Sequence, residues 1–183
     1  MPYAFGGAVA LAYCVYEARG THDLDINVFV PVSAVDAVIA ALPREVVVSD
    51  TDRGILERDG QVRLHWGDMP VDIFLSTDPF HDDALAHVRP VPFVEGVTIP
   101  VLGCKHLAVF KSFFARGKDF VDIGHMVEAN SIDDVEVRAI VAGFLGEESR
   151  EVAALDRAIE EARQAPDDPM GGRFSPRSAQ PRE

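Results

Sequence analysis

Short segments in which hydrophobic and polar residues alternate dominate the first hundred positions, and this period of two is typical of β-strands. Gly67-Asp68 lies between two such segments and is typical of a hairpin turn. We predict strands over about 2–5, 24–30, 45–49, 61–66 and 71–76, with a small β segment over 91–101. A sheet is therefore expected in the first half of the chain.

Helical periodicity appears in other segments and becomes continuous after residue 103. Ser33 is a good N-cap for a helix that Pro43 ends, and residues 50–54 have the composition of a turn. We predict helices over 7–18, 33–42, 79–87, 104–116, 118–129, 133–145 and 148–164. Gly117, Asn130-Ser131 and Gly146 separate the last four of them.

Together these segments predict an α+β fold, in which a mixed β-sheet is flanked by helices and followed by a C-terminal helical lobe. The chain has 183 residues and 48% hydrophobic content, which is enough to bury one sizeable core. We expect an α/β core over 1–102, a helical lobe packed on it over 103–164, and a disordered tail over 165–183. The tail is rich in Pro, Gly, Ser and Arg and has no apolar period.

Net charge limits the classes of partner. The chain carries 30 acids against 17 bases, a formal charge of −13, so a nucleic-acid partner would need a local basic groove or bound metal ions. No apolar run is long enough to cross a bilayer and the N-terminus does not resemble a signal peptide, so we expect a cytoplasmic protein without a membrane partner. For Cys14 and Cys104, apolar surroundings and the missing secretory signal favour buried thiols over a disulfide.

Two carboxylates at the start of one predicted strand are the first candidate for chemistry. Asp23 and Asp25 point to one face because strand side chains alternate, while Leu24 and Ile26 form the opposite, apolar face. A plain acidic strand start would give the same pattern. The pair at 50 and 52 has the same spacing, but the turn residues around it favour a solvated loop.

Asp72 supplies a third carboxylate within a strand that has hydrophobic neighbours on both sides. A lone aspartate there is costly unless it is paired or bound to a cation, and an ion pair with Arg63 or Arg89 would also account for it. If the strands are neighbours, three carboxylates converge, and oxygen-only ligands favour Mg²⁺ or Mn²⁺. The natural use of such a site is metal-assisted phosphoryl or nucleotidyl transfer.

Several motifs in fixed order resemble one known family. These are Gly6-Gly7, Arg19-Gly-Thr21-His-Asp23-Leu-Asp25-Ile26, Val71-Asp72-Ile73-Phe74, Leu107, Lys111, Arg116 and Lys118-Asp119-Phe-Val-Asp122. The order resembles the nucleotidyltransferase fold of the DNA polymerase β superfamily, over residues 3–130. Within it, the chain is most similar to small bacterial proteins related to the AbiEii abortive-infection toxins.

The resemblance implies a role for each matching residue. Asp23, Asp25 and Asp72 would be catalytic and hold Mg²⁺ or Mn²⁺. The nucleotide would be bound by Gly6, Gly7, Arg19, Lys111, Arg116, Asp119 and Asp122. Simpler readings exist for several of these: Lys111 could extend outward to solvent, Asp119 and Asp122 could complement a helix dipole, and the two arginines could pair with Glu17 or Asp119. Many family members have Gly-Ser where this chain has Gly6-Gly7.

The activity that the resemblance implies is transfer of a nucleoside monophosphate from an NTP to an acceptor hydroxyl. Toxin relatives suggest a tRNA 3′ end as acceptor and a cognate antitoxin as partner. The excess of acids favours a small or cationic acceptor instead, as in nucleotidyltransferases that modify aminoglycosides or lincosamides. A third reading is a non-catalytic module that uses the same cleft for binding or for homodimer formation.

Overall fold

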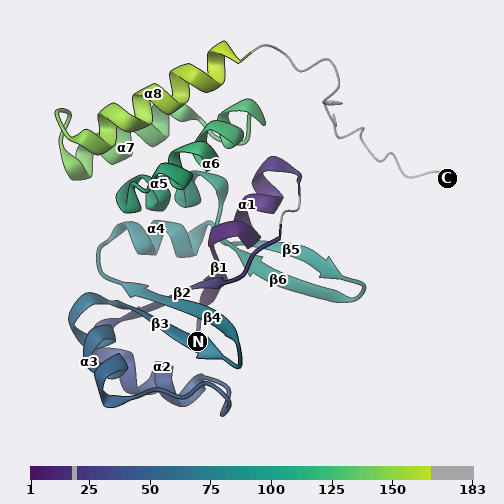
Figure 1. Cartoon of the computed structure of the whole chain (residues 1–183), viewed down its shortest axis with the longest axis vertical. Coiled ribbons are helices and arrows are strands. Elements are labelled where there is room, and N and C mark those ends of the chain that lie inside the picture. Colours follow the sequence, from purple (N-terminus) through teal and green to yellow (C-terminus); the bar gives the residue numbers. More distant parts are fainter. Residues whose placement is uncertain (18–19, 166–183) are drawn as a thin grey trace.

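The structure is a computed structural model that describes residues 1–17 and 20–165. Arg19 and residues 166–183 lie outside the described residues, so the predictions for Arg19 and for the tail are not addressed. A six-stranded mixed sheet crosses the molecule, with strand order β3-β4-β2-β1-β6-β5 (Figure 1). The strands are β1 (Tyr3–Phe5), β2 (Leu24–Pro31), β3 (Gln61–Trp66), β4 (Met69–Ser76), β5 (Arg89–Val94) and β6 (Val97–Val101).

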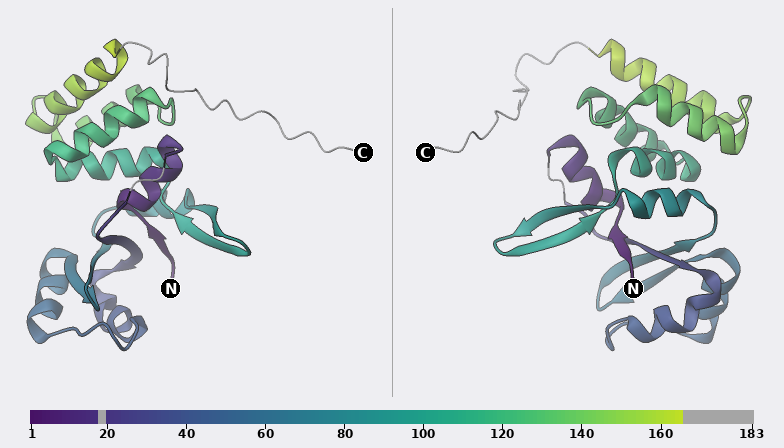
Figure 2. Two further views of the ribbon diagram at one scale, coloured as in Figure 1. Left: turned by 45° about the vertical axis from the view of Figure 1, so that its right-hand side comes forward. Right: turned by 180° about the vertical axis from the view of Figure 1, so that it is seen from behind.

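Helices cover the sheet on both sides. The shorter group lies against β2, β3 and β4 and consists of the 3₁₀ turn η1 (Val32–Ala34), α2 (Val35–Ala41) and α3 (Asp50–Asp59). The larger group of helices lies on the opposite side and consists of α1 (Gly7–Val15), α4 (Phe80–Ala86), α5 (Cys104–Phe114), α6 (Gly117–Glu128), α7 (Asp134–Leu145) and α8 (Arg150–Gln164). The β5–β6 hairpin extends away from the body (Figure 2).

Strand alternation explains the two hydrophobic clusters. Val28, Ile73 and Leu75 point to one face of the sheet and pack with Val35 and Leu56 from the shorter helix group. The second cluster is larger and joins α1, α4, β6 and the helices α5 to α8. It crosses the predicted boundary at residue 102, and the division into a core and a lobe stays a prediction.

The predicted α+β class is confirmed, as are the β3–β4 hairpin and the four C-terminal helices. The predicted strand over 45–49 is wrong: only Val46 forms an isolated bridge, to Trp66. The predicted turn over 50–54 is also wrong, because these residues begin α3. Ser49 and Asp52 form a capping box in which each side chain accepts the other's backbone N–H, and this reciprocal cap starts the helix.

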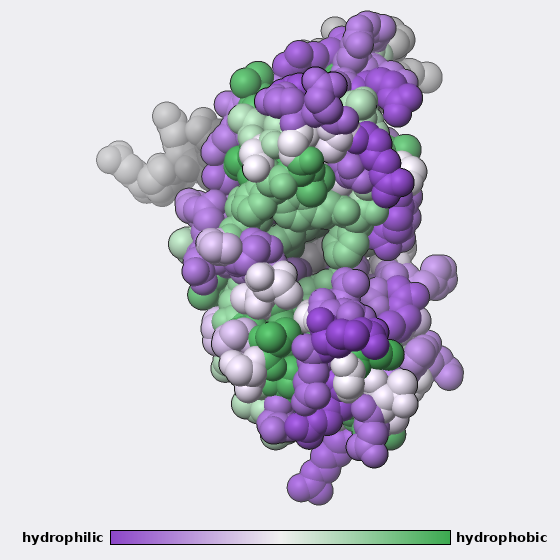
Figure 3. Space-filling view, turned by 90° about the vertical axis from the view of Figure 1, so that its left-hand side faces the viewer, coloured by the Kyte–Doolittle hydropathy of each residue, from purple (hydrophilic) through white to green (hydrophobic). Residues whose placement is uncertain are grey.

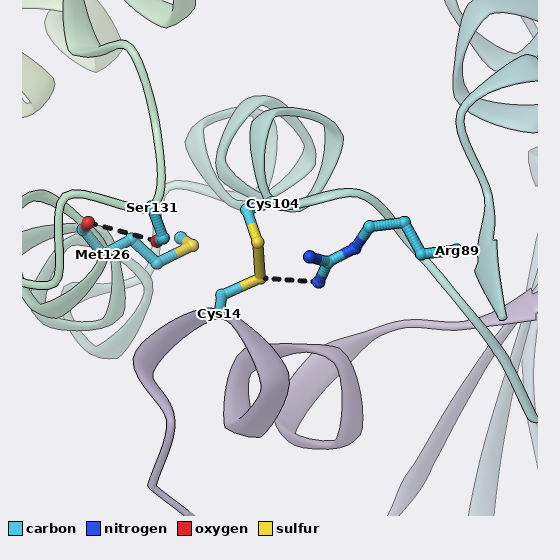
Figure 4. The surroundings of a disulfide bond; sticks show 5 residues. All are labelled: Cys14, Arg89, Cys104, Met126 and Ser131. Atoms are coloured by element: carbon cyan, nitrogen blue, oxygen red, sulfur yellow. Dashed lines mark hydrogen bonds between the residues drawn. A yellow bond between two sulfur atoms is a disulfide. The ribbon is translucent and has the colours of Figure 1, made fainter. Parts of the chain in front are cut away.

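Two further predictions are wrong, one on the N-cap at Ser33 and one on the two cysteines. Ser33 is not a helix N-cap, because it lies inside η1 and α2 begins only at Val35. Cys14 and Cys104 are not free thiols: they form a disulfide between α1 and α5, with Cα atoms 5.6 Å apart (Figure 4). Local surroundings do not reveal this disulfide, because it depends on the packing of α1 against α5 across 90 residues of chain.

Within the described residues, the structure contains no helix with the length and apolarity needed to cross a membrane.

Candidate active site

Two predicted site residues occupy matching positions on neighbouring strands. β2 and β4 pair in parallel, and Asp25 and Asp72 are register partners in this pairing. Asp23 lies just before β2, and its Oδ2 is 3.5 Å from Arg63 Nη2, the atom that also pairs with Asp72. The predicted convergence of the three carboxylates is therefore present in the fold.

Arg63 lies beside two of these carboxylates. It is the register partner of Asp72 across β3 and β4, and its Nε and Nη2 donate to Asp72 Oδ1 and Oδ2 at 2.7 and 2.6 Å. Its Nη2 also lies 3.5 Å from Asp23 Oδ2. The ion pair considered from the sequence is thus formed, and it occupies both carboxylate oxygens of Asp72. The Arg63 side chain is 54% exposed, so it can leave without disrupting the core.

Asp25 is the carboxylate with the least compensation. Partial burial, together with the nearby charges of Asp23 and Asp72, raises the pKa of Asp25 above its ordinary value. The positive charges of Lys111 and Arg116 act in the opposite direction on this pKa, but each has a smaller effect. Within the described part of the chain, no side chain donates a hydrogen bond to the Asp25 carboxylate. A cation at this position would relieve the repulsion.

Gly7 lies directly against Asp25. Its φ is +48°, in the left-handed region, and a Cβ added there would collide with Asp25 Oδ2. The preceding Gly6 donates its backbone N–H to Asp25 O at 2.8 Å, which holds the turn at the start of α1. The Gly6-Gly7 pair therefore brings backbone close to the carboxylate without steric conflict, as the sequence suggested.

We expect Gly7→Ala to lower the free energy of unfolding by about 2–4 kcal/mol, because it combines an unfavourable φ with a steric collision. Urea denaturation followed by circular dichroism measures this. The control is Gly54→Ala in α3, where a Cβ meets nothing within 4 Å and should add up to about 1 kcal/mol through helix propensity. Equal stability of the two variants would contradict the packing described for Gly7.

A cavity of about 230 Å³ opens beside Asp25 on the same face of the sheet. Its charged lining includes Asp25, Lys111 and Arg116, and its aromatic lining includes Phe74, Phe110 and Phe113. The rings of Phe74 and Phe114 lie 5.4 Å apart and connect β4 to the end of α5. A hollow bordered by hydrophobic surface is visible at mid-height on one face of the molecule (Figure 3). The aromatic residues were missed by the sequence analysis, which weighed only polar groups; their spacing along α5 was the available signal.

Two basic residues on the cavity wall, Lys111 and Arg116, form an ionic group with the buried Asp119 and Asp122. Lys111 is only 6% exposed, and its Nζ donates to Asp122 Oδ2 at 2.6 Å and to Asp119 Oδ1 at 3.3 Å. Arg116 donates from Nε and Nη2 to Asp119 at 2.7 and 3.1 Å. Burial alone would raise the pKa of Asp119, but the hydrogen bond from Arg116 and the charge of Lys111 outweigh it and lower that pKa. Lys111 meets anions, one of the two outcomes left open by the sequence, and these anions belong to the protein itself.

The geometry brings Gly6, Gly7, Asp23, Asp25 and Asp72 together and puts Lys111 and Arg116 on the wall of the adjoining cavity. Asp119 and Asp122 are 0% and 1% exposed; Asp119 pairs with Lys111 and Arg116, and Asp122 pairs with Lys111. Their roles toward a nucleotide stay predictions. Asp50 and Asp52, the pair with the same spacing as Asp23 and Asp25, belong to the first turn of α3 on the other side of the sheet.

Comparison with known proteins gives little beyond this geometry. No protein-family model and no curated protein matches the chain. One solved structure, described as that of a "putative nucleotidyltransferase" from H. pylori, is similar with 13% identity and a TM-score of 0.44, over 89% of this chain and 85% of the other. JHP933 from Helicobacter pylori is similar with 14% identity and a TM-score of 0.36, over 89% and 83%. Similarities of this extent carry no argument about activity.

Proposed function

We propose that this chain is a metal-dependent nucleotidyltransferase, which moves a nucleoside monophosphate from an NTP to an acceptor hydroxyl. The observation that carries the proposal is the register of Asp25 and Asp72 on adjacent parallel strands, with Asp23 close to Arg63 and Gly7 against the Asp25 carboxylate. Arg63 balances only part of the negative charge of three carboxylates so close together, and a bound metal ion would balance the rest.

The donor set fits Mg²⁺ or Mn²⁺, because it consists of carboxylate oxygens and leaves room for phosphates and water. Asp23, Asp25 and Asp72 would hold the metal, which supplies charge neutralisation for the triphosphate and lowers the pKa of the attacking hydroxyl. The raised pKa of Asp25 supports this assignment, since burial and then the charges of Asp23 and Asp72 disfavour its ionised form, which a bound cation would stabilise.

The other residues of the site would bind and orient the nucleotide. Backbone at Gly6 and Gly7 can approach a phosphate because neither residue has a Cβ. Lys111 and Arg116 bring positive charge to the cavity wall, and the aromatic side chains of Phe74 and Phe110 offer an apolar surface for a base. Most of the rate enhancement would then come from positioning and electrostatic stabilisation.

The proposed acceptor is the 3′ end of a tRNA, with a cognate antitoxin as partner and a toxin–antitoxin role. A hydroxyl of an aminoglycoside or lincosamide is the alternative, and the net charge of −13 favours it because such acceptors are cationic. A second copy of this chain is a further proposed partner.

The test is to incubate the whole protein with labelled ATP, CTP, GTP or UTP and Mg²⁺, together with total tRNA or a panel of aminoglycosides and lincosamides. Label on tRNA supports the first acceptor, and label on an antibiotic supports the second. Nucleotide binding by calorimetry without transfer would identify a non-catalytic module. The absence of both transfer and binding at millimolar nucleotide would overturn the proposal.

Arg63→Gln should strengthen Mg²⁺ binding by about three- to tenfold, because the guanidinium competes with the cation for both oxygens of Asp72. Isothermal titration of the nucleotide-free protein with Mg²⁺ measures the change. Arg53→Gln is the control: Arg53 pairs with Asp36 and Glu57 on the opposite side of the sheet, and its loss changes net charge equally. Weaker Mg²⁺ binding in Arg63→Gln than in Arg53→Gln would argue against competition.

A further inference from the structure

A second group of potential metal ligands lies where α4 meets α5, and it shares no residue with the proposed active site. Asp83 lies in the first turn of α4 and His87 is its C-cap residue, four positions later, a spacing that puts two side chains on one side of a helix. His106 comes from the first turn of α5. One ligand atom from each of these three residues lies within 4.8 Å of the other two.

The three side chains already contact one another. His106 Nε2 lies 2.9 Å from Asp83 Oδ2, and His87 Nδ1 lies 3.2 Å from Asp83 Oδ1. The His87 and His106 rings are stacked with centroids 5.2 Å apart. The ring of His106 lies close to Gly103, where an added Cβ would be only 3.1 Å from its Nδ1. That Nδ1 is buried and has no hydrogen-bond partner among the described residues.

Exposure at the other two residues allows an ion to enter and the ligands to close around it. The side chains of Asp83 and His87 are 44% and 55% exposed, whereas that of His106 is 2% exposed. Ligands of a tetrahedral ion bound at about 2.0–2.1 Å lie roughly 3.3 Å apart, so a modest rotation of the two exposed side chains is sufficient. An open groove of about 460 Å³ borders Asp83 and gives a path to it.

We propose that Asp83, His87 and His106 bind a divalent transition-metal ion of the zinc class, with the fourth position open to solvent or to another ligand. Two imidazoles and one carboxylate suit Zn²⁺ and are poor ligands for Mg²⁺. The ion would join α4 to the start of α5. Lys105 need not stay near Asp83 when an ion binds. Its Nζ is closer to Glu136 Oε1, at 3.0 Å, than to Asp83 Oδ2, at 3.7 Å.

The test is calorimetric titration of the metal-free whole protein with Zn²⁺ alone, in the presence of excess Mg²⁺. Wild type should bind one Zn²⁺ at this site, and both His87→Ala and Asp83→Asn should weaken that binding at least tenfold. These two positions are exposed, so the variants should keep the fold, which circular dichroism checks. Co²⁺ should give a visible d–d spectrum of a low-coordinate site in wild type that is lost in His87→Ala.

Two controls separate this site from the rest of the molecule. His65→Ala removes an exposed histidine on β3 and should leave zinc affinity unchanged. Asp25→Asn should also leave it unchanged, so the zinc proposal stands even if the nucleotidyltransferase proposal fails. Absence of 1:1 zinc binding in wild type, or unchanged affinity in either His87→Ala or Asp83→Asn, overturns the inference and leaves a hydrogen-bonded tie between two helices.

Discussion

Asp25→Asn is expected to abolish nucleotidyl transfer, with a loss on the order of 10³-fold, while increasing the stability of the metal-free fold. Activity falls because the variant loses a carboxylate that would hold the metal. Stability rises by about 0.5–2 kcal/mol, because a partly buried charge beside Asp23 and Asp72 is removed. Labelled NTP transfer and urea denaturation without divalent ions measure the two effects.

The stability gain should depend on pH in a defined direction. The raised pKa of Asp25 means that the folded state binds this proton more tightly than the unfolded state. The cost of the charged carboxylate is therefore fully present above the folded-state pKa. It disappears as the pH falls toward the ordinary value of 3.8, where the variant and the wild type should converge. Glu95→Gln, in the exposed β5–β6 turn, removes the same charge and should change stability by less than about 0.5 kcal/mol.

A gain that persists in acid, or lower stability of Asp25→Asn near neutral pH, would contradict the electrostatic description of the site. Retained transfer activity would remove Asp25 from the proposed catalytic residues.

Lys111→Met should lower the free energy of unfolding by about 3–5 kcal/mol, because it leaves buried carboxylates without their common cation. Asp119 keeps its hydrogen bonds from Arg116 in this variant. Adding Asp122→Asn to Lys111→Met should recover part of the loss, because it removes one of the two buried negative charges beside position 111. Chemical denaturation of the two single variants and the double variant gives the coupling free energy directly.

Lys105→Met is the matched control for this prediction, since Lys105 lies on the same helix and has an acidic partner, Glu136, but is partly exposed. Its replacement should cost less than about 1 kcal/mol in the absence of metal. Similar losses in Lys105→Met and Lys111→Met would show that burial of the ionic group contributes little to stability.

The local elements were largely predictable because their signals are local. Alternation identified the strands, and helical periodicity with glycine punctuation identified the four C-terminal helices. Errors arose where one local signal was misjudged. Residues 49–52 read Ser-Asp-Thr-Asp, and the serine and the second aspartate, three residues apart, form a capping box, yet turn composition outweighed that signal. The Asp83 and His87 spacing was also visible in a predicted helix, but its partner His106 is 19 residues beyond His87.

Sequence by itself determined that Asp23 and Asp25 lie two positions apart at the start of a strand, that Asp72 sits in another strand, and that Gly6-Gly7 precedes a helix. The patterns behind these facts are local, so they need no knowledge of neighbours in the fold. Only the tertiary structure decided that Asp25 and Asp72 are register partners, that Arg63 pairs with Asp72, and that Lys111 is enclosed by two aspartates. It also decided the Cys14–Cys104 disulfide. Each of these depends on which segments distant in the chain become neighbours, and burial of the two hydrophobic clusters, rather than any local pattern, selects that arrangement.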